Sequence, residues 1–124
     1  MSLLRFFKSF KWAWQGLKLT FRTEQNFKLE LLGFIFVVLL GFFFKISKEE
    51  FIYIVCVSSL VLFAELINTA IERITDLTVD KRKTGFARQA KDIGAAAVLI
   101  LSLNAIIIGC IIFIPRILLF FYKL

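Results

Sequence analysis

Histidine is absent from the sequence, which removes the side chain most often used as a general base and as a nitrogen ligand for metals. Only two cysteines occur, Cys56 and Cys110, and both lie inside apolar runs without forming a CxxC pair. We therefore expect buried free thiols rather than a disulfide. Phosphate-binding loops of the GxxxxGK[ST] and GxGxxG types are also missing. Any phosphate site must therefore be built on helices from carboxylates, amides and basic side chains.

Polar residues are too few for a water-soluble domain of this length. The chain has 124 residues, of which 60% are hydrophobic and 16 are Phe. Its mean hydropathy is +0.85. A domain this small has too little interior to bury so much apolar surface. We therefore expect a single all-α integral membrane domain over residues 1–124.

The first segment, residues 3–22, has the pattern of an amphipathic helix. One face is rich in aromatic residues and the opposite face is basic, as is typical of a helix that lies in the membrane interface. Basic aromatic helices also occur in nucleic-acid-binding proteins, but those modules do not normally carry three apolar spans behind them. We therefore expect no nucleic-acid partner.

Three apolar stretches follow, and we expect transmembrane helices at 27–45, 49–77 and 91–114. The second extends beyond the membrane at its C-terminal end. The Lys and Arg residues are unevenly placed: six precede residue 29, six lie in 73–91, and the remaining four lie in the 45–50 turn and at the C-terminus. By the positive-inside rule, the N-terminus and the 73–91 loop are predicted to be cytoplasmic.

Local signals predict where these spans begin and end. Thr23 is expected to cap the first span. Ser47 and Glu50 are spaced as a capping box at the start of the second. Gly85 is expected to form the turn before the third span, and Pro115 to end it, which leaves the last residues as an interfacial tail.

One face of the second span carries an unusual set of polar residues. Glu65 follows a charge-free run, and Asn68, Glu72 and Asp76 lie three, seven and eleven residues after it. At the helical period, these four side chains fall within one narrow arc. A set of helix-end charges facing water would explain Glu72 and Asp76 but not Glu65 or Asn68. Ionisable groups inside a membrane span suggest function.

Depth separates the two glutamates on this face. Glu65 lies about 21 Å into its span, inside the cytoplasmic half of the hydrocarbon core, and Glu72 lies about 10 Å closer to the cytosol. Converging carboxylates without His or Cys suit a hard cation such as Mg²⁺, which commonly combines one or two carboxylates with substrate phosphates. Arg5 and Lys91 could neutralise further phosphate charge. Positioning and charge neutralisation are most of what phosphoryl transfer requires.

Three pieces of the sequence together resemble a known family. They are Glu65-Leu-Ile-Asn-Thr-Ala-Ile-Glu72 with Asp76, Ala90-Lys-Asp-Ile-Gly-Ala-Ala-Ala-Val-Leu-Ile100, and Trp14-Gln-Gly-Leu with Glu24 and Glu30. The chain is similar to the small bacterial integral-membrane lipid kinases, the diacylglycerol kinase and undecaprenol kinase family. The resemblance covers nearly the whole chain.

The resemblance implies a homotrimer in the bacterial cytoplasmic membrane with active sites between subunits. It implies transfer of the γ-phosphate of Mg·ATP to a lipid hydroxyl. We expect diacylglycerol as the acceptor, giving phosphatidic acid, with undecaprenol as the alternative. Thr69 stands where diacylglycerol-directed members often have Ser, and in this respect the chain is similar to the undecaprenol-directed branch.

The resemblance also implies roles for individual residues. Glu65 corresponds to the catalytic base and Asn68 to a partner that orients it. Further positions are implied for Mg²⁺ (Glu24 and Glu72), for the nucleotide (Arg5, Trp12, Asp76, Lys91 and Asp92) and for the lipid (Arg5, Glu30, Glu65 and Asn68). The family's usual Tyr-His pair is missing from residues 80–89, so the adenine contacts stay open.

Two other hypotheses fit parts of the pattern. A non-enzymatic oligomer could line a cation site with the same carboxylates. It would leave Lys91, Asp92 and the basic amphipathic helix unexplained. The second of these hypotheses is a degenerate kinase that binds lipid without phosphorylating it.

Overall fold

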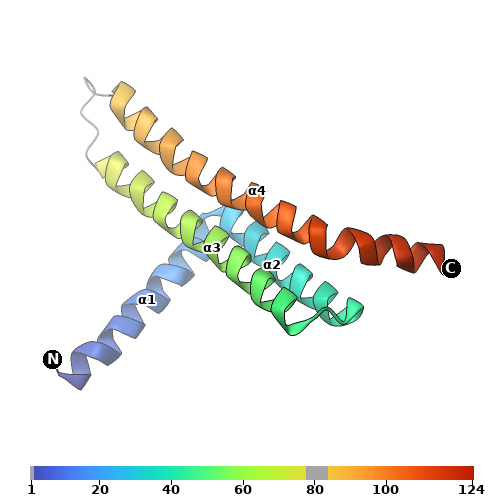
Figure 1. The fold of residues 1–124 in the computed structure, drawn as a ribbon. Helices are drawn as coiled ribbons and strands as arrows, with labels where there is room; N and C mark the ends of the chain where they lie inside the picture. The colour runs from blue at the N-terminus through green and yellow to red at the C-terminus, as the bar shows by residue number, and fades with distance from the viewer. Residues whose placement is uncertain (1, 78–83) are drawn as a thin grey trace.

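The computed structural model describes residues 2–77 and 84–124, and within them the chain is helical without strands (Figure 1). The helices are α1 (Leu3–Thr23), α2 (Gln25–Phe44), α3 (Lys48–Leu77) and α4 (Thr84–Tyr122). Three of them, α2, α3 and the 85–122 part of α4, are long and apolar enough to cross a membrane. The predicted architecture, an N-terminal helix followed by three spans, is confirmed.

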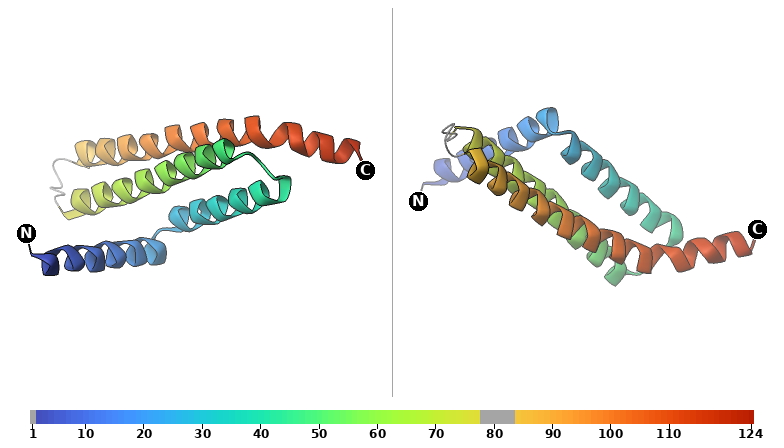
Figure 2. Two further views of the ribbon diagram at one scale, coloured as in Figure 1. Left: turned by 60° about the horizontal axis from the view of Figure 1, so that its bottom comes forward. Right: turned by 90° about the horizontal axis from the view of Figure 1, so that it is seen from above.

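The helices form a bundle of three with α1 projecting from it. Helices α3 and α4 lie side by side and antiparallel over most of their length, and α2 packs against α3 (Figures 1 and 2). Helix α1 leaves the bundle at the start of α2, so only its C-terminal end lies near α3 (Figure 1). The junction of α1 and α2 therefore lies beside the polar stretch of α3.

A single residue breaks the chain between α1 and α2. Glu24 has φ −105° and ψ 111°, an extended conformation, while Thr23 is the last residue of α1. The prediction that Thr23 caps α2 is wrong, because Thr23 is the last residue of α1. Its hydroxyl has one proton to donate and lies within hydrogen-bond distance of Leu19 O and of Glu24 Oε1, at 3.0 and 2.8 Å. This break places the Glu24 carboxylate at the corner between the two helices.

The turn between α2 and α3 is well defined. Lys45 adopts a left-handed conformation with φ 51°, and the Ile46 N–H donates to Gly41 O at 3.1 Å, which closes α2 in the manner of a Schellman motif. The predicted capping box is confirmed. Ser47 N–H donates to Glu50 Oε1 at 3.0 Å, and Glu50 N–H donates to Ser47 Oγ at 3.2 Å.

Helix α4 is longer than the sequence signals predicted. It includes Gly85, so the turn expected there is wrong, and it continues through Pro115 to Tyr122, so the expected interfacial tail is helical. Proline removes one backbone N–H and crowds the preceding turn, which bends a helix without necessarily ending it. Figure 1 shows α4 bending toward its C-terminal end.

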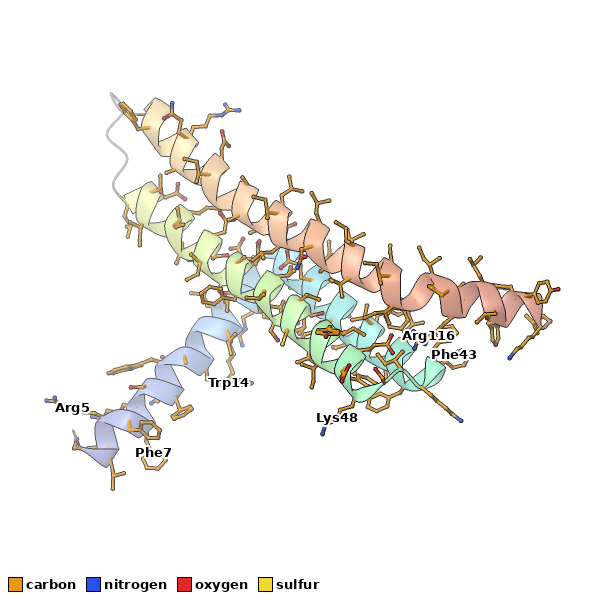
Figure 3. All side chains as sticks on the ribbon, viewed as in Figure 1. Arg5, Phe7, Trp14, Phe43, Lys48 and Arg116 are labelled. Carbon is orange, nitrogen blue, oxygen red and sulfur yellow. The ribbon has the colours of Figure 1, made fainter. Side chains whose placement is uncertain are left out.

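An ion pair across the bundle supports α4 beyond the proline. The two terminal nitrogens of Arg116 donate to the two Glu50 carboxylate oxygens at 2.9 and 2.8 Å, and Nη1 also donates to Ile112 O at 2.7 Å (Figure 3). This two-point contact fixes the last turns of α4 against the start of α3. It explains why the helix continues where its local sequence predicts an end.

The apolar core is small because most apolar side chains face outward. Its main cluster of buried residues is formed by Ile46, Ile54, Ile112 and Phe113. Cys56 and Cys110 are free thiols, as predicted, but both are exposed. The expectation that they are buried is wrong, because in a membrane protein an apolar run can lie against lipid instead of against the protein core.

Candidate functional site

Glu65 and Asn68 are buried in the middle of α3. Their relative exposures are 3% and 7%, while Tyr53 and Phe63 on the same helix are exposed. Burying a carboxylate and an amide while leaving aromatic rings outside reverses the usual soluble pattern. Exposure rises along the polar face, from buried Glu65 through partly buried Glu72 to exposed Asp76. The structure therefore supports a single polar face that runs from the inside of the bundle to its margin.

Asn68 contacts Glu72 instead of Glu65. Its Nδ2 donates to Glu72 Oε1 at 3.3 Å, and Oδ1 is buried without a hydrogen-bond donor among residues 2–77 and 84–124. The role of Asn68 as the partner that orients Glu65 stays a prediction, and the contact that the structure shows is the one to Glu72. Glu65, three residues before Asn68, and Glu72, four residues after it, are both its neighbours on the helical face, so helical spacing alone does not select between them.

Carboxylates from three elements converge around Glu65. Glu24 and Glu72 are close enough for their charges to act on Glu65, and Glu65 acts in the same way on Glu30 of α2. One oxygen of Glu30, Oε2, is buried and lacks a partner within the described residues. The candidate metal and base residues therefore lie together with Glu30, one of the candidate lipid residues, near the corner where α1 and α2 meet α3. Like charges so placed would favour a bound cation among them.

Basic side chains hold two acidic members of this region. Arg73 Nη2 lies 3.8 Å from Glu24 Oε1. Lys91 Nζ of α4 lies 2.5 Å from Asp76 Oδ1 of α3. The structure thus brings together two of the residues expected at the nucleotide, Lys91 and Asp76, across the α3–α4 interface. Asp92 is exposed beside them on α4.

Arg5 and Trp12 are not brought to the carboxylates within one chain. Arg5 lies near the free end of α1, away from the other helices (Figure 3). Trp12 is 64% exposed. A projecting helix cannot fold its distant end back onto α3, because its backbone hydrogen bonds keep it straight. These two expected nucleotide contacts would have to come from an assembly of chains.

The described residues hold no ready-made metal site. Nowhere in 2–77 or 84–124 do three or more His, Cys, Asp or Glu side chains form a group able to bind a metal ion by themselves. Glu24 and Glu72 approach Glu65 from different helices, which is compatible with a cation that takes its remaining ligands from a substrate.

An apolar cavity of about 600 Å³ lies between α2, α3 and α4. Its described lining includes Val37, Ile54 and Val61, and Glu30 is the single charged side chain among the lining residues. The walls suit hydrocarbon, and Glu30 connects the cavity to the group of carboxylates. The adenine contacts were left open for residues 80–89, and of these residues 80–83 lie outside the part of the chain that the structure describes.

The sequence reading missed three residues at this site. Thr23 and Arg73 contact Glu24, and Gly94 approaches Asn68. In the sequence, Arg73 is only one of the positive charges that set the predicted topology. Its position directly after Glu72 is the signal that could have indicated a role at this site. In the sequence, Gly94 stands out only as part of the 90–100 piece that resembles the family. Which side chain it meets depends on the packing of α3 against α4.

Comparison with known proteins decides the family. The family model described as prokaryotic diacylglycerol kinase matches residues 11–113. The chain belongs to the prokaryotic diacylglycerol kinase family. It is therefore a membrane lipid kinase, and the three-span architecture is that of a membrane protein.

Individual relatives carry two names. The chain is 40% identical to the undecaprenol kinase of Bacillus subtilis, over 92% of each chain. It is 33% identical to the diacylglycerol kinase of Synechocystis sp., over 89% of this chain and 63% of that protein. It is 28% identical to the diacylglycerol kinase of Escherichia coli K12, over 86% and 87% of the two chains.

Proposed function

We propose that this lipid kinase transfers the γ-phosphate of Mg·ATP to the hydroxyl of a membrane lipid, with Glu65 as the catalytic base. The observation that carries this proposal is the buried Glu65 carboxylate, 3% exposed, with the carboxylates of Glu24 and Glu72 beside it. A deep carboxylate can accept the proton of a lipid hydroxyl as that hydroxyl attacks phosphorus. The shallower carboxylates lie toward the side from which a charged donor would arrive.

Glu24 and Glu72 are proposed to hold Mg²⁺. The donor set fits this ion, because Mg²⁺ prefers oxygen ligands and commonly takes only one or two carboxylates together with phosphate oxygens. When bound, the ion would neutralise charge on the phosphates during transfer. The carboxylates themselves orient and retain it.

The nucleotide is proposed to lie at the cytoplasmic end of α3 and α4. Lys91 would exchange its contact with Asp76 for the phosphates, and Asp76 and Asp92 would then serve the ribose side. Arg5 and Trp12 complete the site if α1 of one chain reaches α3 of another. Their separation from the carboxylates within a single chain supports sites between subunits, and the number of subunits proposed, three, is the one that the family resemblance implies.

The orientation proposed for this site places the N-terminus and the 73–91 segment in the cytosol. The uneven distribution of Lys and Arg supports it. Bacterial ATP is cytosolic, so this orientation also puts Lys91 and Glu72 on the side of the donor.

Undecaprenol is the acceptor that the comparisons favour, in place of the diacylglycerol expected from the sequence. The support is the 40% identity to an undecaprenol kinase over 92% of both chains. Thr69, buried at 4% exposure beside Asn68, points the same way. Diacylglycerol stays as the second candidate because two relatives with lower identity carry that name.

A side-by-side phosphorylation assay tests both levels of the proposal. Purified protein in mixed micelles is given Mg·ATP with either undecaprenol or diacylglycerol, and Glu65→Gln serves as the inactive control. Faster transfer to undecaprenol supports the acceptor. Faster transfer to diacylglycerol overturns the acceptor but keeps the lipid kinase, and ATP-dependent transfer to neither overturns the reaction proposed.

A further inference from the structure

Gly94 lies where α4 packs against the polar face of α3. It is buried, and a Cβ built on it would collide with Asn68 Oδ1. The same Cβ would lie 3.8 Å from Ile71 Cδ1, an ordinary contact. At Gly109, on the same helix, a Cβ would meet nothing within 4 Å. The absence of a side chain at position 94 is therefore required by one particular neighbour, the Asn68 amide.

The Asn68 amide has little freedom to move away. Its NH₂ group must face Glu72, because a carboxylate only accepts hydrogen bonds and Nδ2 donates to Oε1 there at 3.3 Å. That orientation directs Oδ1 toward Gly94. The Cα–H that a Cβ would replace points at this oxygen, which gives the buried acceptor a weak C–H···O contact. Rotating the amide to admit a methyl group would break the bond to Glu72.

We propose that Gly94 is a positioning residue for Asn68 and, through Asn68, for the Glu72 carboxylate. This inference rests on the proposed function, in which Glu72 is a magnesium ligand. Glycine lets α4 approach α3 closely enough to fix the position of the Asn68 amide. The fixed amide then holds the Glu72 carboxylate in one orientation. Groups that orient a metal ligand typically change metal affinity by about 10- to 100-fold when they are lost.

Gly94→Ala and Gly109→Ala form a matched pair of variants. Both replace a mid-helix glycine of α4 by alanine, so both change helix propensity in the same way. Only the first places a methyl group against Asn68. Melting temperatures in detergent micelles are measured for both, for Asn68→Ala, and for Gly94→Ala combined with Asn68→Ala. We expect Gly94→Ala to melt below Gly109→Ala, and the difference to vanish when Asn68 is already truncated.

Metal binding is measured without turnover. Mn²⁺ stands in for Mg²⁺, and its binding in the presence of a non-hydrolysable ATP analogue is followed by electron paramagnetic resonance. We expect Mn²⁺ to bind about tenfold more weakly to Gly94→Ala than to wild type. Gly109→Ala should bind it as wild type does.

Two results would overturn the proposal. Equal melting temperature and equal Mn²⁺ affinity in the two alanine variants would show that Gly94 does not position the Asn68 amide. A lower melting temperature with unchanged Mn²⁺ affinity would make Gly94 a packing residue without influence on Glu72. Failure of the wild type to phosphorylate any lipid would instead overturn the proposed reaction, while the melting and Mn²⁺ measurements would still decide the role of Gly94.

Discussion

Arg73 of α3 contacts Thr23 at the end of α1, where its Nη2 donates a hydrogen bond to Thr23 Oγ1 at 3.0 Å. The Thr23 hydroxyl in turn donates to Glu24 Oε1 at 2.8 Å. A basic residue of one helix and a hydroxyl of another thus hold a carboxylate at the corner between α1 and α2. Glu24 is the only carboxylate of the proposed site that lies in a break between helices, so its position depends on these contacts.

Arg73→Gln is expected to raise the Mg²⁺ concentration for half-maximal activity by about two- to fivefold, the range for partly exposed ion pairs. The physical reason is that Glu24 loses the charge that holds it. The measurement is activity against Mg²⁺ concentration at saturating ATP. Lys48→Gln removes one positive charge from the other end of α3 and should leave the Mg²⁺ dependence unchanged. An equal effect of both variants would refute a local role for Arg73.

Glu65→Gln is expected to lower the rate of lipid phosphorylation by at least about 100-fold, the usual contribution of a positioned base. The amide keeps the size of the side chain but cannot accept the proton. Assembly in detergent, measured by light scattering, should match wild type. Glu49→Gln, at the opposite end of α3, provides the control. A Glu65→Gln protein that works at near wild-type rate would show that the base is elsewhere.

Lys91→Gln is expected to raise KM for ATP by about tenfold, because a charged contact to phosphate is lost. Asp76→Asn should change KM less, since it frees Lys91 for the phosphates and leaves an amide that can still hydrogen-bond on the ribose side. Initial rates against ATP concentration distinguish the two variants. If Asp76→Asn raised KM as much as Lys91→Gln, the charge of Lys91 would not be the main nucleotide contact at this end of α3 and α4.

Arg116→Gln is expected to lower the melting temperature by about 5 °C while the activity of the folded protein is kept. The estimate corresponds to a loss of about 1 kcal/mol, after allowance for the exposed part of both side chains. The contact that is lost is the two-point pair with Glu50. The double variant with Glu50→Gln should melt above Arg116→Gln alone, because no unpaired charge is left behind. A melting curve identical to wild type would mean that the pair does not support α4.

Much of the fold could be predicted because it depends on local patterns. The apolar runs determine three spans, and the spacing of Ser47 and Glu50 correctly indicated the cap of α3. The errors came where a distant contact outweighs a local signal. Pro115 has the sequence pattern of a helix end, but Arg116 binds Glu50 from another helix and α4 continues.

The candidate site divides in the same way. Helical spacing alone placed Glu65, Asn68 and Glu72 on one face of α3. It could not reveal that the Asn68 amide turns toward Glu72, because that choice depends on the space left by Gly94 of α4. The Cys56 and Cys110 thiols illustrate a related limit, since hydrophobic sequence does not distinguish a core from a lipid-facing surface.

The sequence by itself determined that this protein is an all-helical membrane protein with carboxylates on one face of a span, because periodicity and hydrophobicity act along the chain. The sequence also contains the motifs by which the family is identified. Only the tertiary structure decided which side chains hold those carboxylates, namely Arg73 and Thr23 at Glu24, and Asn68 at Glu72. Such contacts join helices or depend on the space between them, and they require side-chain positions that no single helix specifies.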